Sequence, residues 1–178
     1  MSSNTIFVWQ SVNLFCGDHD PLASKHLTLQ ELKLPTLQEI QADHHAGGSR
    51  FAIEVGVGAE KLESSFKLGG FDPSLMGQFG AGSGKPKIYT AYSEILDKKT
   101  GRSIEGKAVM EGYLGKNEGD AWQAGEFAGH DYSINGLTHY EFSFDEKVLF
   151  RWDFWTNENT TPDGDRNAER NRILRIPQ

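Results

Sequence analysis

The stretch Leu62–Gly84, LESSFKLGGFDPSLMGQFGAGSG, holds a strand pattern, a glycine corner and a helix pattern in that order. Between Leu62 and Leu68 the residues alternate between two sides, which is the period of a β-strand with one buried face. The side expected to be buried carries Leu62, Ser64, Phe66 and Leu68. Gly69-Gly70 ends this strand, so the chain turns sharply here into another element.

The element after the corner has the start and stop signals of a short helix. Asp72 occupies the N-cap position and Pro73 the first helical position, where its missing N–H costs nothing. Gly80 stands where a helix needs a left-handed terminator, so the pattern predicts a helix of about two turns. The side chains expected to pack on an apolar surface are Leu75, Met76 and Phe79.

Most of the remaining chain has strand patterns. They cover residues 5–15, 27–34, 51–57, 88–96, 104–114, 140–144 and 148–154. A change of phase at Gln30-Glu31 predicts a bulge, and the turn DKKTG predicts a long hairpin between residues 88–96 and 104–114. We therefore predict a mainly β fold, an antiparallel β-barrel or sandwich with one short flanking α-helix.

Length and composition restrict the class of protein. The 178 residues fit one domain with a core, spanning residues 1–178. A formal net charge of −7 argues against a nucleic-acid-binding surface, which needs clustered cations. The one cysteine, Cys16, excludes an internal disulfide framework and indicates a reducing cytoplasm. The sequence predicts neither a signal peptide nor a transmembrane helix, so we expect no membrane partner.

Motifs for catalysis and for ligand binding are incomplete. The run Gly80–Pro86, GAGSGKP, resembles a phosphate-binding loop but lacks its first glycine and its final Ser or Thr. The run Asp163–Leu174 opens like a calcium loop but has Ala168 where a glycine is required, and Leu174 where an acidic ligand is required. We therefore predict no catalytic residue, no cofactor and no metal site.

The polar run ADHHAGGS contains two adjacent histidines, His44 and His45, in a predicted exposed loop. They lack the further ligands of a zinc site, so an inter-subunit contact is the favoured interpretation. Cys16 and His19 could form a nucleophile and base, but no orienting group is implied. An enzyme centred on Asp43, His44 and His45 stays an alternative that alanine substitution would test.

The only basic cluster comes near the end of the chain. It consists of Arg166, Arg170, Arg172 and Arg175. Because the chain is acidic and this cluster could neutralise few phosphates, we favour a solvated end or a clasp onto an acidic neighbour over nucleic-acid binding.

Several strings resemble, in their order, the major tail tube proteins of contractile-tailed bacteriophages and the related R-type bacteriocins. The strings are LKLPTL (Leu32–Leu37), ADHHAGGS (Ala42–Ser49), EKLESSFKLGGFDPSLMGQFG (Glu60–Gly80), GDAWQAGE (Gly119–Glu126) and HYEFSFDEKVLFRWDF (His139–Phe154). The most specific of them is the unit of a strand, LGGFDP and a helix. None is a catalytic motif, so the resemblance predicts a structural protein and no enzyme.

The resemblance implies a tail-tube fold that assembles six to a ring, with strands of all subunits closing a β-barrel around a bore. Rings would stack into a conduit inside a contractile sheath, with baseplate and tail terminator proteins as further partners. The genome would pass through without specific binding during ejection. The virion tail would be the location, after assembly in the host bacterial cytoplasm.

The same resemblance implies which parts of this chain bridge subunits. They are an N-terminal arm 1–5, a bridging loop 43–50 and a C-terminal tail 157–178, whose clasping part is 166–178. The inter-subunit contact candidates are Asp43, His44, His45, Ser49, Arg50, Arg166, Arg170, Arg172 and Arg175.

Two alternative functions stay open on the sequence. The first is the ring-forming tube protein of a bacteriocin or of a secretion-type contractile injection system. The second is a monomeric β-sandwich that binds a ligand such as carbohydrate through Trp122, Trp152 and Trp155.

Overall fold

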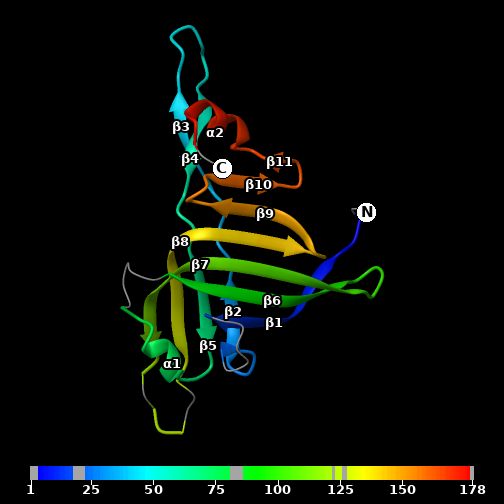
Figure 1. Ribbon diagram of the computed structural model, residues 1–178, viewed down its shortest axis with the longest axis vertical. Coiled ribbons are helices and arrows are strands. Elements are labelled where there is room, and N and C mark those ends of the chain that lie inside the picture. The colour runs from blue at the N-terminus through cyan, green and yellow to red at the C-terminus, as the bar shows by residue number, and fades with distance from the viewer. Residues whose placement is uncertain (1–3, 18–22, 81–85, 122, 126–127, 177–178) are drawn as a thin grey trace.

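The computed structural model describes residues 4–17, 23–80, 86–121, 123–125 and 128–176. Its main feature is one large antiparallel sheet, from which a long hairpin projects (Figure 1). The path of strands through this sheet, in spatial order, is β1 Phe7–Cys16, β6 Lys87–Asp97, β7 Ser103–Gly119, β8 His130–Phe144, β9 Lys147–Asp153, β10 Glu158–Thr161 and β11 Gly164–Asp165. The predicted mainly β fold is confirmed.

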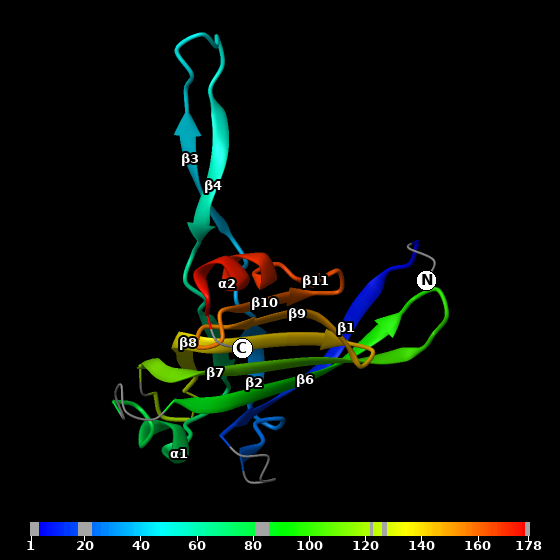
Figure 2. The ribbon, with the colours of Figure 1, turned by 45° about the horizontal axis from the view of Figure 1, so that its top comes forward.

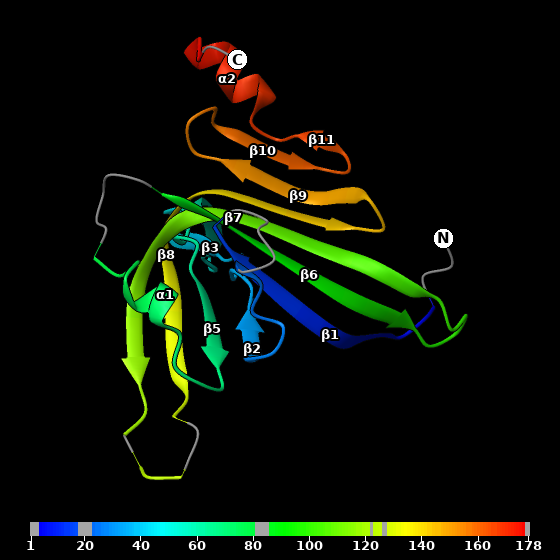
Figure 3. The ribbon, with the colours of Figure 1, turned by 60° about the horizontal axis from the view of Figure 1, so that its bottom comes forward.

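A second layer covers one side of this sheet. It is formed by β2 Leu29–Lys33 and β5 Ser64–Leu68, and β5 pairs with the first residues of β8. Figure 3 shows β7 and β8 bending from one layer into the other. The β7–β8 ladder shifts register between Glu111 and Tyr113, at Gly112, where a Cβ would lie 2.8 Å from the Asn135 carbonyl oxygen; on β8, Gly136 has a φ of +58°. Both positions need glycine, one for space and one for its backbone conformation.

The hydrophobic core lies between the two layers. Its buried members are Leu14, Cys16, Phe66, Leu68, Leu75, Tyr89, Ala91, Ala108, Met110, Leu114, Tyr132, Ile134, Leu137 and Tyr140. The rings of Phe66 and Tyr132 stack with their centroids 4.9 Å apart, which joins β5 to β8. Leu29, Leu32 and Leu34 pack against this core from the second layer.

The sheet does not close into a barrel within the subunit. β1 pairs with β6 along its length, and its other edge has a single bridge, from Phe15 to Ser24. No ladder joins β1 to β2 in the described part of the chain. The fold is therefore a two-layer β structure with a free edge strand.

The stretch Leu62–Gly84 folds largely as its pattern predicts. Ser64, Phe66 and Leu68 are buried in β5, and Asp72 caps helix α1 Pro73–Met76 by accepting from the backbone N–H of Ser74 and Leu75. The helix has one turn because Gly77, and not Gly80, is its C-cap. Leu75 is buried as expected, but Met76 and Phe79 are exposed, so that part of the prediction is wrong.

The polar end of the chain is more regular than its composition suggests. Residues from Asn157 onward form β10, β11 and a second helix, α2 Ala168–Leu174, although the sequence predicts one helix only. The strand predicted at 104–114 is longer in the structure, because β7 runs from Ser103 to Gly119. Trp122 and residues 81–85 of the phosphate-loop-like run lie outside the described residues.

A two-stranded hairpin stands apart from both layers. β3 Glu39–His44 pairs only with β4 Ile53–Ala59, and the hairpin extends far beyond the rest of the molecule (Figures 1 and 2). The sequence predicts the strand of β4 but not β3, and it places Asp43 and His44 in a loop. Both residues lie in β3, and the turn between the strands begins after them.

Candidate assembly surfaces

The hairpin β3–β4 is exposed along its whole length. Every residue of both strands is exposed to solvent, including Ile53, Val55 and Val57. An isolated two-stranded hairpin is at best marginally stable in water, and exposed apolar side chains in a row are uncommon on a monomer. The regular alternation of β4 therefore has no core beneath it within the described part of the subunit.

The two sides of the hairpin differ in chemistry. Directly paired residues share a side, and the pairs His44–Ile53 and Ala42–Val55 fall on one of them. With Ile40, these residues form what we call the apolar side. The opposite side carries Glu39, Asp43 and Glu54, which we call the acidic side; Asp43 pairs with Glu54, and the Glu39 carboxylate reaches toward Gly56.

The turn of the hairpin holds the other residues predicted for the bridging loop. Ser49 folds the turn, since its hydroxyl donates to the Phe51 carbonyl at 2.8 Å and its N–H donates to the Ala46 carbonyl. His45, Ser49 and Arg50 are all exposed. The structure thus brings the five predicted residues of this region, Asp43, His44, His45, Ser49 and Arg50, together in the outer part of one hairpin.

Neither a metal site nor a nucleophile is built around these residues. Asp43 and His44 point to opposite sides of the hairpin, and the described ranges contain no cluster of three or more potential metal ligands. Burial raises the pKa of the Cys16 thiol to about 12, which leaves it protonated and unreactive. His19, its candidate base, lies outside the described residues.

Helix α2 presents the predicted arginines. An asparagine cluster anchors it: buried Asn171 donates to the Asn157 carbonyl at 3.2 Å, and Asn167 donates to the same carbonyl at 3.0 Å. Asn157 has a φ of +52°, a conformation that asparagine tolerates well. With Asn171 turned inward, Arg166, Arg170, Arg172 and Arg175 are all exposed.

The face of the main sheet opposite the core is open and rich in carboxylates. Because directly paired residues share a face, the open face can be followed across the strands, and it carries Glu94, Glu105, Glu111, Glu141, Asp153 and Glu158. Glu94 and Glu105 are direct cross-strand partners. Like charges that face each other across two strands destabilise a sheet, so the stability of the subunit does not explain why both glutamates are present.

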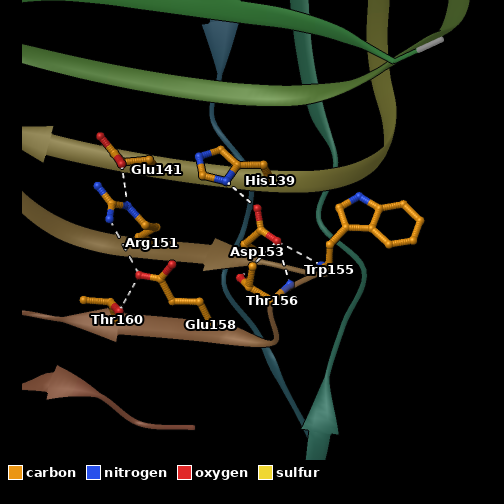
Figure 4. Close-up of polar contacts among 8 residues, drawn as sticks. All are labelled: His139, Glu141, Arg151, Asp153, Trp155, Thr156, Glu158 and Thr160. Carbon is orange, nitrogen blue, oxygen red and sulfur yellow. Dashed lines mark hydrogen bonds and ion pairs between the residues drawn. The ribbon is translucent and has the colours of Figure 1, made fainter. Parts of the chain in front are cut away.

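The cations on this open face are already engaged. Arg151 donates from Nε to Glu141 at 2.6 Å and lies 3.7 Å from Glu158 (Figure 4). The Lys107 ammonium lies over the Tyr92 ring, 5.8 Å from its centroid. The open face therefore exposes carboxylates to solvent, while Arg151 lies against Glu141 and Glu158 and Lys107 lies against Tyr92.

Asp153 anchors the end of β9 on the same face. Its carboxylate lies 3.1 Å from Nδ1 of His139 and accepts from the backbone N–H of Trp155 and Thr156 (Figure 4). Burial by itself would raise the pKa of Asp153, but these hydrogen bonds hold it below its ordinary value. The group is therefore a carboxylate at neutral pH.

Exposed aromatic side chains lie near the ends of the sheet. Trp9 on β1 and Trp155 after β9 are 57% and 72% exposed, whereas Trp152 is half-buried. Beside β1 a groove of 520 Å³ opens, and its lining includes Trp9, Leu32 and Phe142. Of the tryptophans named for a sugar-binding module, Trp152 is half-buried, Trp155 is exposed, and Trp122 lies outside the described residues.

The sequence does not locate the open face, because alternation along one strand does not tell which strands lie side by side. The signal was present: Glu105, Lys107 and Glu111 alternate with buried residues along β7. It becomes a continuous surface only when the register of neighbouring strands is known.

Comparisons with known proteins identify the family and the fold of this chain. The family model described as "Phage tail tube protein FII" matches residues 23–174. A chain of the sheath-tube complex of PVC, an extracellular contractile injection system, in the extended state has the same fold, with a TM-score of 0.53 and 7% identity over 78% of this chain and 86% of that chain. A chain of the sheath/tube terminator of the same system has a TM-score of 0.49 and 7% identity over 78% of this chain and 91% of that chain. No curated protein matches the sequence.

The family match runs through every strand except β1 and includes the hairpin, the open face and α2. No helix in the described ranges has the length and apolar character needed to cross a membrane. The chain belongs to the phage tail tube protein FII family, and it is a tail tube subunit.

Proposed function

We propose that six copies of this chain close a ring and that rings stack into a hollow conduit. The observation that carries the proposal is the open architecture of the subunit: among the described residues one edge of β1 has the Phe15–Ser24 bridge but no ladder, and the whole hairpin β3–β4 is uncovered. Free edges invite uncontrolled pairing, and ring closure through neighbouring copies satisfies them. On this proposal the chain is a single tail-tube domain, residues 1–178, with bridging extensions.

The bridging element is larger than the loop 43–50. The entire hairpin from Glu39 to Ala59 is available to reach a neighbour, with the apolar side as the surface to be buried. The N-terminal arm 1–5 and the C-terminal tail 157–178 are the other proposed bridges. Thr5 already contacts Asp97 through its hydroxyl, while residues 1–3 lie outside the described part.

We assign the open face of the main sheet to the bore. The core and the second layer cover the other side, so only this face can line a wall one sheet thick. Its carboxylates repel phosphates. Its cations Arg151 and Lys107 are held by Glu141 and by the Tyr92 ring, so they are less available to bind the phosphates of a passing genome. DNA would pass without specific binding, as a conduit requires.

The outer surface would then face the remaining partners. We propose a contractile sheath around the tube, with a tail terminator and a baseplate at its ends, and a structural rather than an enzymatic role. A sheath around the tube is supported by the similar fold of a chain in the PVC sheath-tube complex. The particle would be a virion tail, assembled in the host bacterial cytoplasm before genome ejection.

A second candidate has a specific observation in its favour. One structure with the same fold comes from an extracellular contractile injection system, in which a similar tube would serve a particle of another kind. A bacteriocin or secretion-type tube and a phage tail tube share the subunit architecture, so the fold does not separate them. Isolation of particles with or without packaged DNA would do so.

The test of the proposed function is assembly of the purified chain. We expect rings or stacked tubes of uniform diameter in negative-stain electron microscopy at high protein concentration, with sixfold symmetry in end views. Mass measurement in solution should show a species heavier than one subunit under the same conditions. Monomers alone, in the presence and absence of sheath protein, would overturn the proposal, as would a substrate turned over by the monomer.

The assignment of the bore predicts the accessibility of Glu105, which is exposed in the subunit. In tubes of Glu105→Cys, a small maleimide should label the thiol while a bulky polyethylene-glycol maleimide should not. In the free subunit both reagents should react. Ser65→Cys, on the outward side of β5, is the matched control and should react with both reagents in both states; buried Cys16 stays silent. Equal labelling of Glu105→Cys tubes by the bulky reagent would place this face outside.

A further inference from the structure

Two oppositely charged surfaces of the subunit have no partner within it. The first is the acidic side of the hairpin, where Glu39, Asp43 and Glu54 are exposed. None of the three takes part in an ion pair or a side-chain hydrogen bond in the described residues. No lysine or arginine lies on this side in either strand of the hairpin.

The second surface is the arginine patch, which we define as Arg166, Arg170 and Arg175. Arg172 is excluded because Glu169 holds it through two hydrogen bonds. The nearby Asp165 is also engaged, since it accepts from the backbone N–H of Asn159 and Asn167. The arginine patch therefore has no ionic partner among the residues that the structure describes.

The fold holds both surfaces in place. The asparagine cluster fixes α2 on the β9–β10 turn, so the arginine patch points into solvent. The hairpin extends past α2 and projects from the body of the subunit (Figures 1 and 2), and the residues of its acidic side are exposed. Exposed Ile173 and Leu174, 64% and 62% accessible, add apolar area beside the arginines.

We propose that the acidic side of the hairpin of one copy docks on the arginine patch of another copy in the assembled tube. This inference rests on the proposed tube and names the contact that sets its register. An isolated surface ion pair contributes little, but three carboxylates facing three guanidinium groups form a network, repeated at every subunit. Such complementarity selects one docking position and disfavours the others, because a shifted register brings like charges together.

The arrangement also assigns the two sides of the hairpin different tasks. The apolar side supplies burial, which is non-directional, and the acidic side supplies register. Arginine suits the receiving surface because its planar fork binds a carboxylate in two places. In a chain of net charge −7, a cationic patch of this kind also offsets repulsion between neighbouring copies.

Charge reversal tests the contact. We expect Asp43→Lys/Glu54→Lys and Arg170→Glu/Arg175→Glu each to raise the protein concentration required for tube formation by about tenfold or more. The variant with all four changes restores opposite charges and should return within about threefold of the wild type. As a net-charge control for the carboxylate reversal, Glu31→Lys/Glu146→Lys alters two exposed carboxylates away from both surfaces and should assemble like the wild type. Sedimentation and electron microscopy across a protein dilution series give the readout.

The outcomes separate this contact from the tube itself. If wild-type tubes form but the fourfold variant is no better than the two parents, the contact is wrong and the tube stands. If the arginine reversal leaves tubes intact and instead abolishes binding of sheath protein, the arginine patch serves the sheath and the inference is overturned. Failure of the wild type to assemble under every condition rejects the proposed function before the variants are compared.

Discussion

The double variant Ile53→Asp/Val55→Asp is expected to fold normally and to form no tubes. Both side chains are exposed in the subunit, at 61% and 43%, so their replacement removes no buried contact. In the tube they belong to the apolar side of the hairpin, where a buried carboxylate without a partner is strongly unfavourable. Tubes should therefore be absent in electron microscopy at concentrations where the wild type assembles fully.

The matched control changes the other side of the same strand. Glu54→Gln keeps the size of the side chain and leaves two of the three carboxylates of the acidic side, so tubes should still form, with at most a modest shift in the assembly concentration. Thermal unfolding of the aspartate variant should match that of the wild-type monomer within about 0.5 kcal/mol, as for an ordinary surface change. Normal tubes from the aspartate variant would show that the apolar side stays in solvent.

Asp72→Ala is expected to lower the free energy of unfolding by about 3–5 kcal/mol, the range for breaking a buried ion pair. Asp72 lies 2.6 Å from the ammonium of Lys25, whose side chain is only 6% exposed. The same carboxylate caps α1 through Ser74 and Leu75. Its removal leaves the buried Lys25 ammonium without a counter-charge, with the Ser74 hydroxyl 3.4 Å away as its remaining partner among the described residues, and leaves two helix N–H groups uncapped.

This free energy is measured by urea unfolding, with Asp72→Ala introduced into the Ile53→Asp/Val55→Asp variant. That variant is expected to stay monomeric, so unfolding is not coupled to assembly. Asp72→Asn is the control, because asparagine caps a helix as well as aspartate does but carries no charge and so cannot form the ion pair with Lys25. Adding Lys25→Met to Asp72→Asn should recover part of the loss by removing the orphaned charge. A loss below about 1 kcal/mol for Asp72→Ala would show that only the cap matters.

The same pair makes stability depend on pH. Burial would raise the pKa of Asp72, but hydrogen bonds from Lys25 and Ser74 and the charge of Lys25 lower it below its ordinary value. A depressed folded-state pKa gives stability that is present above the unfolded pKa and is lost as pH falls through the folded one. The wild-type subunit should lose this stabilisation below about pH 4, and Asp72→Asn should lack that component of the slope.

The elements predicted best are those whose signals are local. The strand β5, the N-cap at Asp72, the bulge between Leu29 and Glu31 and the hairpin β6–β7 all follow from alternation, capping and turn residues. The helix α1 ends early at Gly77 because a C-cap depends on backbone geometry, which composition does not reveal. Helix α2 was missed because its anchor is polar: Asn171, not an apolar stripe, is the buried residue.

The candidate surfaces also differ in how far the sequence predicts them. The bridging region and the arginines are recognisable as residues, and the structure groups them on the outer hairpin and on α2. Whether they contact other subunits stays a prediction. The open face needed strand register, since Glu94 and Glu105 are neighbours in space and 11 positions apart in the chain.

The sequence by itself determined a mainly β protein with a strand, corner and helix unit, an acidic balance and no complete catalytic or metal motif. These properties depend on residue type and on spacing within a few positions. Only the tertiary structure decided that the sheet stays open at β1, that β4 alternates without a core beneath it, and that the carboxylates of several strands share one face. The physical reason is that edge pairing, burial and cross-strand register depend on contacts between distant segments, which alternation along a single strand does not specify.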